Sequence, residues 1–191
     1  MSMLAGPRLT VQAAWFVTAS IWIAKGFRAK RTERSQDAGP RGLHVAVVAL
    51  AAVLVAFGPD WPLYQATAGL QWTSAALVVG GCLFAICARL QLGANWSPHA
   101  AIKSGHDLVQ HGAYAWSRHP IYTGILTALA GTALVMGQTG AWAAFCLLAT
   151  SFHFKTNAEE AFMESRFGAN YIAYRRRVRR LIPLIWSLTL A

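Results

Sequence analysis

Charged residues are scarce in this sequence. Only 13% of its 191 residues are Asp, Glu, Lys or Arg, whereas 55% are hydrophobic, and the mean hydropathy is +0.38. A soluble domain usually contains about 25% charged residues. The shortage of charge therefore argues against an ordinary soluble domain and indicates an integral membrane protein, with the lipid bilayer as a partner.

Acidic residues are especially few. The chain has 7 Asp and Glu against 17 Lys and Arg, which gives a net charge of +10. Such an excess could indicate nucleic-acid binding, but the basic residues gather in short segments that flank apolar runs. That placement is typical of sequences that encode membrane orientation. We therefore expect no nucleic-acid partner.

Cysteines are also few. Cys82, Cys87 and Cys146 each lie inside an apolar run, which argues against a disulfide framework and favours buried small side chains. Three histidines, His99, His106 and His111, are spread across one loop with no cysteine partner, so their spacing does not match that of a zinc site. We predict no metal.

Long apolar runs are abundant and divide the chain into helical spans. A membrane span needs about twenty mostly apolar residues, and several of these runs are shorter. Pro120 opens the fourth run at a position that favours proline. The segment Gly137–Gly140 then forms a turn, which predicts a helical hairpin over residues 119–154. The five predicted spans are residues 9–24, 43–57, 70–88, 120–136 and 141–154.

The basic residues predict one orientation for these spans. All but one of the 17 lie in residues 25–42, in residues 89–119 or after residue 154. Five spans with the N-terminus outside place all three segments on one side, and the positive-inside rule makes that side cytoplasmic. The sequence thus predicts an all-α polytopic fold with about five transmembrane helices. Cytoplasmic, interfacial helices are expected at the C-terminus, including the short apolar stretch 181–190.

Polar side chains interrupt the apolar pattern at two places. Arg118 and His119 stand at the start of the fourth span, and Glu159 and Glu160 follow the fifth. Charged groups at a membrane boundary are costly unless they bind something, so we expect a binding or catalytic site at the cytoplasmic face. A basic run further along predicts an anchor on anionic lipid; its members are Arg176, Arg177, Arg179 and Arg180.

These motifs, taken in order, resemble the isoprenylcysteine carboxyl methyltransferase-like membrane proteins. The related phospholipid methyltransferases share the Arg-His-Pro and Glu-Glu elements. The resemblance covers about residues 90–183, and Ala113 departs from the proline that the family usually has there. Its motifs are Leu92-Gly93-Ala94-Asn95-Trp96-Ser97, His106-Asp107-Leu108-Val109, Gly112-Ala113-Tyr114, Arg118-His119-Pro120-Ile121-Tyr122-Thr123-Gly124, Glu159-Glu160, Phe167-Gly168 and Tyr171.

The resemblance implies a methyltransferase that uses S-adenosylmethionine and methylates a lipophilic acceptor at the cytoplasmic face. Together with the apolar runs, it predicts two parts. Residues 1–91 form three transmembrane helices with the basic loop 25–42, and residues 92–191 form a catalytic region with the hairpin 119–154 and an amphipathic C-terminal segment. The small size and the lack of an organelle signal favour a bacterial inner membrane and a small acceptor, such as an isoprenoid carboxylate or a lipid.

Particular residues follow from the same resemblance. Glutamates can accept hydrogen bonds from ribose or pair with the ammonium of the cofactor, and tyrosine rings can hold adenine or favour a sulfonium. The expected cofactor-binding residues are Gly112, Tyr114, His119, Pro120, Tyr122, Glu159, Glu160 and Tyr171. The expected catalytic residues are Arg118, Arg175 and Glu160, and the expected substrate-binding residues are Asn95 and Trp96.

The acceptor chemistry stays open at this point. A carboxylate acceptor needs a cation to orient it, for which Arg118 and Arg175 are candidates. An amine or phenol acceptor needs a base, for which His119 or Glu160 could serve.

Four alternatives also stay open. His119 could only cap the fourth helix, and the two glutamates could lie in the first turn of a helix and favour its dipole. The chain could be an NADPH-dependent membrane reductase of steroid-like or polyprenyl substrates. Such enzymes usually carry an Asn-Tyr pair and an acidic residue soon after the Gly of the motif, where this chain has Ile121-Tyr122 and Gly124-Ile125. It could also be a non-enzymatic membrane protein with an idle pocket.

Overall fold

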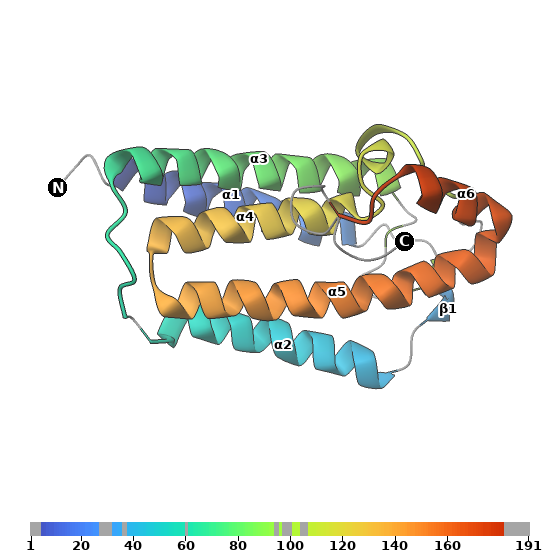
Figure 1. Ribbon diagram of the computed structural model, residues 1–191, viewed down its shortest axis with the longest axis horizontal. Coiled ribbons are helices and arrows are strands. Elements are labelled where there is room, and N and C mark those ends of the chain that lie inside the picture. The colour runs from blue at the N-terminus through green and yellow to red at the C-terminus, as the bar shows by residue number, and fades with distance from the viewer. Residues whose placement is uncertain are drawn as a thin grey trace.

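The computed structural model describes residues 5–26, 32–35, 38–59, 61–93, 96, 101–103 and 107–181. Five long helices lie side by side, and two short ones lie at one end of the bundle (Figure 1). The predicted helical class is confirmed, and each of the five predicted apolar spans lies within one long helix. The helices are α1 (Ala5–Gly26), α2 (Ala38–Phe57), α3 (Ala68–Leu92), η3 (Gly112–Ala115), α4 (Pro120–Met136), α5 (Thr139–Phe167) and α6 (Ala169–Arg177).

Helices α3 and α4 are in the closest contact in the bundle, because glycines remove the side chains between them. A Cβ atom on Gly81 would lie 2.6 Å from the carbonyl oxygen of Gly124, and a Cβ atom on Gly131 would lie 2.9 Å from that of Ser74. Small residues of this kind allow the backbones of membrane helices to approach closely. The packing of α3 on α4 therefore fixes the start of α4, where Arg118 and His119 lie.

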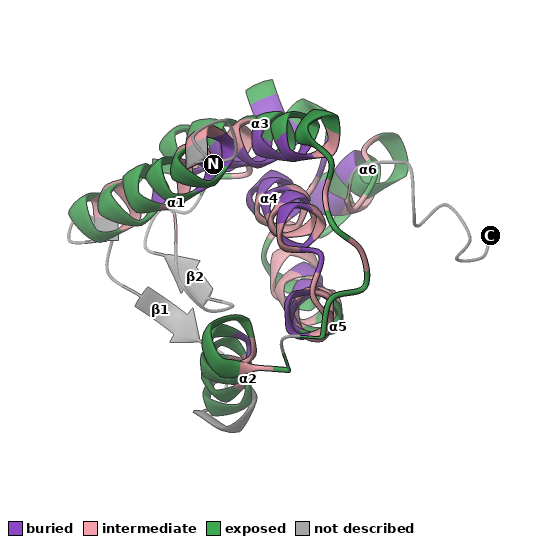
Figure 2. Cartoon of the chain, turned by 90° about the vertical axis from the view of Figure 1, so that its left-hand side faces the viewer, coloured by how far each residue is buried: buried purple, intermediate pink, exposed green. Residues whose placement is uncertain are grey.

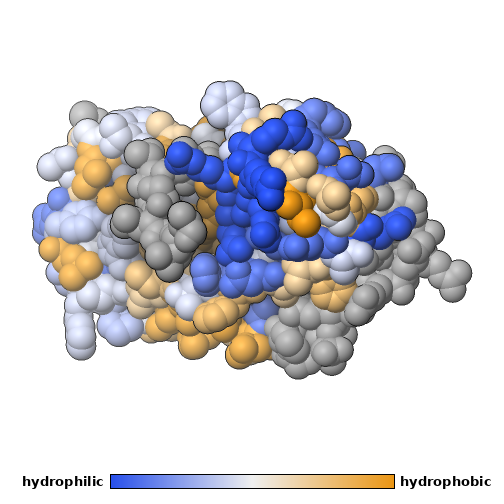
Figure 3. Space-filling model, turned by 45° about the vertical axis from the view of Figure 1, so that its right-hand side comes forward, coloured by the Kyte–Doolittle hydropathy of each residue, from blue (hydrophilic) through white to orange (hydrophobic). Residues whose placement is uncertain are grey.

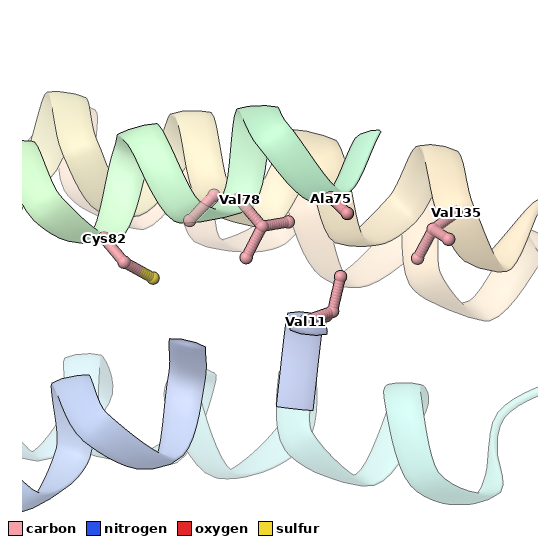
Figure 4. Close-up of a cluster of buried hydrophobic side chains, with 6 residues drawn as sticks. Val11, Ala75, Val78, Cys82 and Val135 are labelled. Carbon is pink, nitrogen blue, oxygen red and sulfur yellow. The ribbon is translucent and has the colours of Figure 1, made fainter. Parts of the chain in front are cut away.

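Helix α1 packs on α3 and α4 through a small apolar cluster (Figure 4). Val11 of α1 lies against Val78 of α3 and Val135 of α4. The indole nitrogen of Trp15 donates a hydrogen bond of 3.0 Å to the hydroxyl of Thr132 on α4. This bond satisfies a polar group that would otherwise be buried without a partner.

Helix α2 packs on α5 on the other side of the bundle. Ala51 of α2 lies against Ala144 and Leu148 of α5. Most of the remaining surface of α2 is exposed, as is much of α1, whereas buried residues concentrate on α3, α4 and α5 (Figure 2). The outer helices thus have few neighbours within the chain.

The exposed surface of these helices is strongly apolar. Large exposed side chains include Phe16 on α1, Val48 on α2 and Leu83 on α3, which is the distribution expected of a surface that faces lipid. Within the described residues, α3 is the one helix that is both long and apolar enough to span a bilayer by length and composition. Gly42–Phe57 and Pro120–Met136 are shorter apolar helices.

Within the described residues, a two-stranded antiparallel sheet departs from the predicted all-α class. Strand β1 (Thr32–Ser35) pairs with β2 (Ala101–Lys103), with Thr32 opposite Lys103 and Ser35 opposite Ala101. The strands come from the segments that follow α1 and α3. The sheet therefore joins two of the three basic segments at the same end of the bundle.

Helix α5 is much longer than the span predicted for it. It continues from the apolar part at residues 141–154 to Phe167, so Glu159 and Glu160 lie more than five turns from its start at Thr139. The alternative that these glutamates are first-turn residues is therefore wrong. The chain reverses at Gly168, whose positive φ of 51° suits glycine, and α6 packs back against the end of α5.

Candidate functional site

The predicted site residues gather at the end of the bundle where α4 begins. Helix α6 and the second half of α5 lie at this end (Figure 1). Hydrophilic side chains form a band across the middle of this side of the molecule, with hydrophobic side chains below them in the view of Figure 3. The polar end thus borders directly on apolar surface.

The segment before α4 pairs with the chain that follows α6. The backbone nitrogen of Arg118 donates to the carbonyl of Arg179, at 2.8 Å, and that of His119 to the carbonyl of Arg180, at 3.1 Å. The hydroxyl of Ser117 also donates to the Arg180 carbonyl, at 2.8 Å. These bonds fix Arg180 beside the Arg118-His119 motif, 61 or more positions away in the chain.

Three cationic or ionisable side chains surround the carboxylate of Glu160, which is only 5% exposed. Arg118 Nε donates to Glu160 Oε1 at 2.9 Å, and His119 Nε2 lies 3.2 Å from the same oxygen. Arg180 contacts both oxygens, at 3.2 Å from Oε1 and 2.8 Å from Oε2. Both oxygens of Glu160 are therefore engaged within the protein.

The neighbouring Glu159 faces a different set of partners, because successive residues on a helix point about 100° apart. Tyr122 donates its hydroxyl hydrogen to Glu159 Oε1 at 2.6 Å. Glu159 Oε2 lies 3.5 Å from Nδ1 of His119, and the Glu159 side chain is 19% exposed. Glu159 thus contacts fewer protein groups than Glu160 and is more accessible.

His119 connects the two glutamates through its two ring nitrogens. It occupies the N-cap position of α4, but its side chain makes no capping hydrogen bond. The alternative that the side chain only caps the helix is therefore wrong. The ring also stacks on Tyr122, with centroids 5.8 Å apart, and Tyr122 stacks on Phe152 of α5 at 4.8 Å.

The charges of the cluster shift its protonation equilibria. Burial alone would raise the pKa of the Glu160 carboxyl, but hydrogen bonds from His119 and Arg180 and the charge of Arg118 lower it to about 2. Burial would lower the pKa of the His119 imidazole, yet its hydrogen bonds and proximity to both glutamates raise that pKa above its usual value. Glu160 is therefore ionised at neutral pH.

The two predicted catalytic arginines occupy different surroundings. Arg118 uses Nη1 to donate to the carbonyls of Arg175, at 2.8 Å, and Val178, at 2.9 Å, in addition to its contact with Glu160. The Arg175 side chain is 45% exposed and pairs with Glu164 at 3.0 Å. The structure brings Arg118 into the glutamate cluster, but it does not bring the Arg175 guanidinium there.

The Gly112 motif has a local packing role. Gly112 has a positive φ of 61°, and a Cβ atom there would collide with the side chain of Gln91. Gln91 Oε1 accepts a hydrogen bond of 2.8 Å from the backbone nitrogen of Ala113. Tyr114 is buried, and its carbonyl accepts a bond of 2.7 Å from the hydroxyl of Tyr174 on α6. The motif therefore docks α6 onto the end of α3.

The remaining predicted residues are placed as follows. Pro120 begins α4, as expected, and is buried. Tyr171 is 2% exposed and packs edge-on against Tyr174, with centroids 6.1 Å apart. Trp96 is half-buried and stacks on the guanidinium of Arg89 at 4.3 Å. Asn95 lies outside the described residues, as does nearly all of the predicted interfacial stretch 181–190.

Sequence reasoning missed two members of the cluster. Arg180 was assigned to a lipid anchor, but its guanidinium contacts Glu160 and also donates to Asn157 Oδ1 at 2.6 Å. Asn157 lies one turn before Glu160 on the same face of α5, and this helical spacing was the signal available for it. No local pattern distinguishes Arg180 from the neighbouring arginines. Within the described residues, no group of three or more His, Cys, Asp or Glu side chains could hold a metal ion.

Comparison with protein families gives one match. The sequence model of the Isoprenylcysteine carboxyl methyltransferase (ICMT) family matches residues 74–165. This range includes most of α3, the Gly112 motif, the Arg118-His119 motif and both glutamates. The resemblance predicted from the motifs is confirmed for this part of the chain.

Curated relatives are named as isoprenylcysteine O-methyltransferases. The protein-S-isoprenylcysteine O-methyltransferase of Schizosaccharomyces pombe is 37% identical over 101 residues, covering 51% of this chain and 43% of that protein. The human protein of the same name is 29% identical over 128 residues, covering 65% and 45%. The chain thus spans less than half the length of either relative.

A solved structure has a similar fold. It is that of the eukaryotic intramembrane Ras methyltransferase ICMT, isoprenylcysteine carboxyl methyltransferase, with a TM-score of 0.52 and 24% identity. The match covers 78% of this chain and 55% of that one. The arrangement of helices is therefore shared well beyond the region that the family model covers.

Proposed function

We propose that this protein is a membrane methyltransferase that transfers the methyl group of S-adenosylmethionine to a lipophilic acceptor. The observation that carries the proposal is the buried cluster in which Arg118, His119 and Tyr122 meet Glu159 and Glu160. The first three residues lie about 40 positions before the two glutamates in the sequence. They lie within the region that is similar to the methyltransferase family.

The carboxylates of the cluster match the hydrogen-bond donors of the cofactor. S-adenosylmethionine presents ribose hydroxyls and an ammonium group, both of which donate hydrogen bonds to carboxylates. Glu159 is the better acceptor, because among the described residues one of its oxygens accepts a hydrogen bond from Tyr122 alone, at 2.6 Å, and the side chain is partly exposed. Glu159 would hold the polar part of the cofactor, and Tyr122 and His119 would position that carboxylate.

Glu160 has a different part in this proposal. A carboxylate with a pKa of about 2 is a weak base at neutral pH, and Arg118, His119 and Arg180 already contact both of its oxygens. Glu160 would therefore act as the anchor that holds the start of α4 and the segment after α6 together, rather than as a general base.

Methyl transfer depends mainly on position. When bound, the cofactor held by Glu159 would supply an activated methyl group on a sulfonium, which an acceptor could attack in line with the departing thioether. Accurate placement and exclusion of water provide much of the rate. The residues of this chain contribute by fixing Glu159, by shielding the site with Tyr122 and Phe152, and by opening it next to apolar surface from which a lipophilic acceptor can enter.

The proposal includes a membrane arrangement with five spanning helices, an outside N-terminus and a site that faces the cytoplasm of a bacterial inner membrane. Pairing of β1 with β2 brings together the basic segments that follow α1 and α3. The bonds of Arg118 with the backbone near Arg179 add the third basic segment. Grouping of the three segments at one end supports this arrangement under the positive-inside rule.

A methyl-transfer assay tests the function. Membranes that contain the protein are incubated with S-adenosylmethionine labelled on its methyl group, and label is measured in the organic-soluble fraction. We expect protein-dependent label, reduced at least about tenfold by Glu159→Gln, which removes the charge of a charge-assisted hydrogen bond. Glu164→Gln is the matched control, because Glu164 pairs with Arg175 on the exposed surface. Equal labelling by the wild type and Glu159→Gln would refute the assignment of Glu159.

A further inference from the structure

His44 of α2 makes two specific contacts with α5. It is half-buried, and its Nδ1 lies 2.8 Å from the hydroxyl oxygen of Ser151, within hydrogen-bond distance. The imidazole also packs on the ring of Phe152, with centroids 5.6 Å apart and the two planes tilted by 38°. Aromatic rings at this separation attract one another. His44 lies outside residues 74–165, which the family model matches.

The ring contact of His44 continues into the candidate site. Phe152 stacks on Tyr122, and Tyr122 stacks on His119. Four side chains from α2, α5 and the start of α4 therefore form one continuous row, here called the ring row: His44, Phe152, Tyr122 and His119. Its last two members contact Glu159, by a 2.6 Å hydrogen bond from Tyr122 and at 3.5 Å from His119 Nδ1. Because closely packed side chains transmit displacements, the position of His44 influences that of the Glu159 carboxylate.

The polar residues of α5 near His44 follow one face of that helix. Ser151, Lys155 and Glu159 are spaced four residues apart, which places them one above another on the helix surface. The Lys155 ammonium lies over the Tyr122 ring, 5.4 Å from its centroid, a distance at which a cation and a ring attract. The charges of Lys155 and Glu159 both act on the His44 imidazole. His44 therefore meets the same face of α5 that carries the proposed cofactor contact.

The rest of the contact between α2 and α5 has a different character. The two helices lie side by side (Figure 1), and Ala51 and Leu54 of α2 belong to an apolar cluster with Leu148 of α5. Among the described residues, this cluster includes no member of the ring row. Apolar packing is not directional, whereas a hydrogen bond and a ring contact have preferred geometries. The apolar cluster thus holds α2 on α5, and His44 fixes the rings.

We propose that His44 is a positioning residue of the cofactor site, which holds Phe152 and Tyr122 so that the Glu159 carboxylate is kept in place for the cofactor. This inference rests on the proposed methyltransferase function. The hydrogen bond with Ser151 sets the rotation of the imidazole, and the imidazole sets the plane of the Phe152 ring. His44 acts on the site through the ring row rather than by touching the cofactor. Helix α2 is therefore a working part of the site as well as a membrane helix.

Binding of S-adenosylhomocysteine to the detergent-solubilised protein, measured by calorimetry, tests this proposal. His44→Ala removes both the ring contact and the hydrogen bond, so its Kd should rise by about threefold to tenfold. His44→Phe keeps an aromatic ring on Phe152 and loses only the hydrogen bond. Its Kd should therefore rise by less than about threefold. Ser151→Ala removes the same hydrogen bond from the other side and should have an effect of similar size.

A double-mutant cycle separates positioning from general packing. Tyr122→Phe keeps every ring of the ring row but removes the hydroxyl that donates to Glu159. In that background His44→Ala should raise the Kd by about twofold or less, because the row no longer holds the carboxylate through this bond. An equal fold-change in both backgrounds would show a purely structural role and would overturn the proposal. If His44→Ala does not fold, Ser151→Ala takes its place in the cycle.

Leu54→Ala is the matched control for loosening of α2. Leu54 packs in the apolar cluster and lies about 15 Å along α2 from His44. This variant should unfold at a lower temperature, whereas its Kd should stay within about twofold of the wild type. Unchanged binding in His44→Ala, or a loss of equal size in Leu54→Ala, would overturn the role of His44 alone. A folded wild type that binds no S-adenosylhomocysteine would refute the methyltransferase function on which the proposal rests.

Discussion

Glu159 and Glu160 are adjacent in the sequence, yet they differ in exposure and in partners. Glu160 is 5% exposed and contacts Arg118, His119 and Arg180, whereas Glu159 is 19% exposed and contacts Tyr122 and His119. Helical geometry separates the two carboxylates and allows His119 to bridge them. The pair therefore combines one structural carboxylate with one that can receive a ligand.

The low pKa of Glu160 predicts a pH-dependent contribution to stability. The pKa of Glu160 is about 2 in the folded protein, against 4.5 for an unperturbed carboxyl. The carboxylate therefore stabilises the folded state above pH 4.5 and loses that effect as the pH falls toward 2. The shift corresponds to about 3 kcal/mol. In detergent, the unfolding temperature of Glu160→Gln should thus lie well below that of the wild type at pH 6. The two unfolding temperatures should converge as the pH falls toward 3.

Glu164→Gln serves as the control for this comparison. Glu164 forms an exposed ion pair with Arg175, and such pairs contribute little to stability. Its unfolding temperature should stay close to that of the wild type throughout. A difference in unfolding temperature between the wild type and Glu160→Gln that stays constant down to pH 3 would show that the arginine contacts do not stabilise the ionised form of Glu160.

Much of the residue-level site could be predicted from the sequence, and the reasons are physical. Arg118, His119 and the glutamates stand out because ionisable groups at the ends of apolar spans are rare. Arg180 does not stand out, since three other arginines lie within four positions of it and only the pairing of its backbone with Ser117 and His119 selects it.

At the scale of elements, the contact between α3 and α4 determines where the site lies. Gly81 and Gly124 face each other so closely that a Cβ atom on either would lie 2.5–2.6 Å from the carbonyl oxygen of the other. The sequence shows both glycines, but it does not show that they meet. Their pairing depends on how the two helices are aligned along each other.

Larger side chains at this contact should separate the two helices. Gly81→Val should destabilise the protein by about 2 kcal/mol or more, because overpacking of a tight contact forces the backbones apart. Gly80→Val is the matched control, since a Cβ atom at Gly80 meets nothing within 4 Å. Thermal unfolding in detergent distinguishes the two variants. Similar unfolding temperatures for both would contradict the close α3–α4 contact.

Two features, the length of α5 and the small sheet, could not be predicted from hydrophobic periodicity. The apolar pattern of the fifth span stops near residue 154, but α5 continues to Phe167 because polar residues also form helices when tertiary contacts support them. Strands β1 and β2 lie about 70 residues apart, so their pairing leaves no local signal in the sequence.

At the scale of the whole molecule, the three basic segments share one end of the bundle. This grouping predicts that Asp107 lies on the cytoplasmic side and Gly69 on the opposite side. In cells that carry the protein without its native cysteines, a membrane-impermeant maleimide should label Gly69→Cys directly. It should label Asp107→Cys only after the cells are permeabilised. Labelling of Asp107→Cys in intact cells would show that the orientation is opposite to the proposed one.

The methyltransferase function itself is tested most directly by ligand binding to the purified, detergent-solubilised protein. Isothermal titration calorimetry would compare S-adenosylmethionine, S-adenosylhomocysteine and NADPH. We expect saturable binding of the two sulfur ligands, weakened by Glu159→Gln, and no binding of NADPH. Binding of NADPH in place of the sulfur ligands, by a protein shown to be folded, would contradict a methyltransferase and favour a reductase.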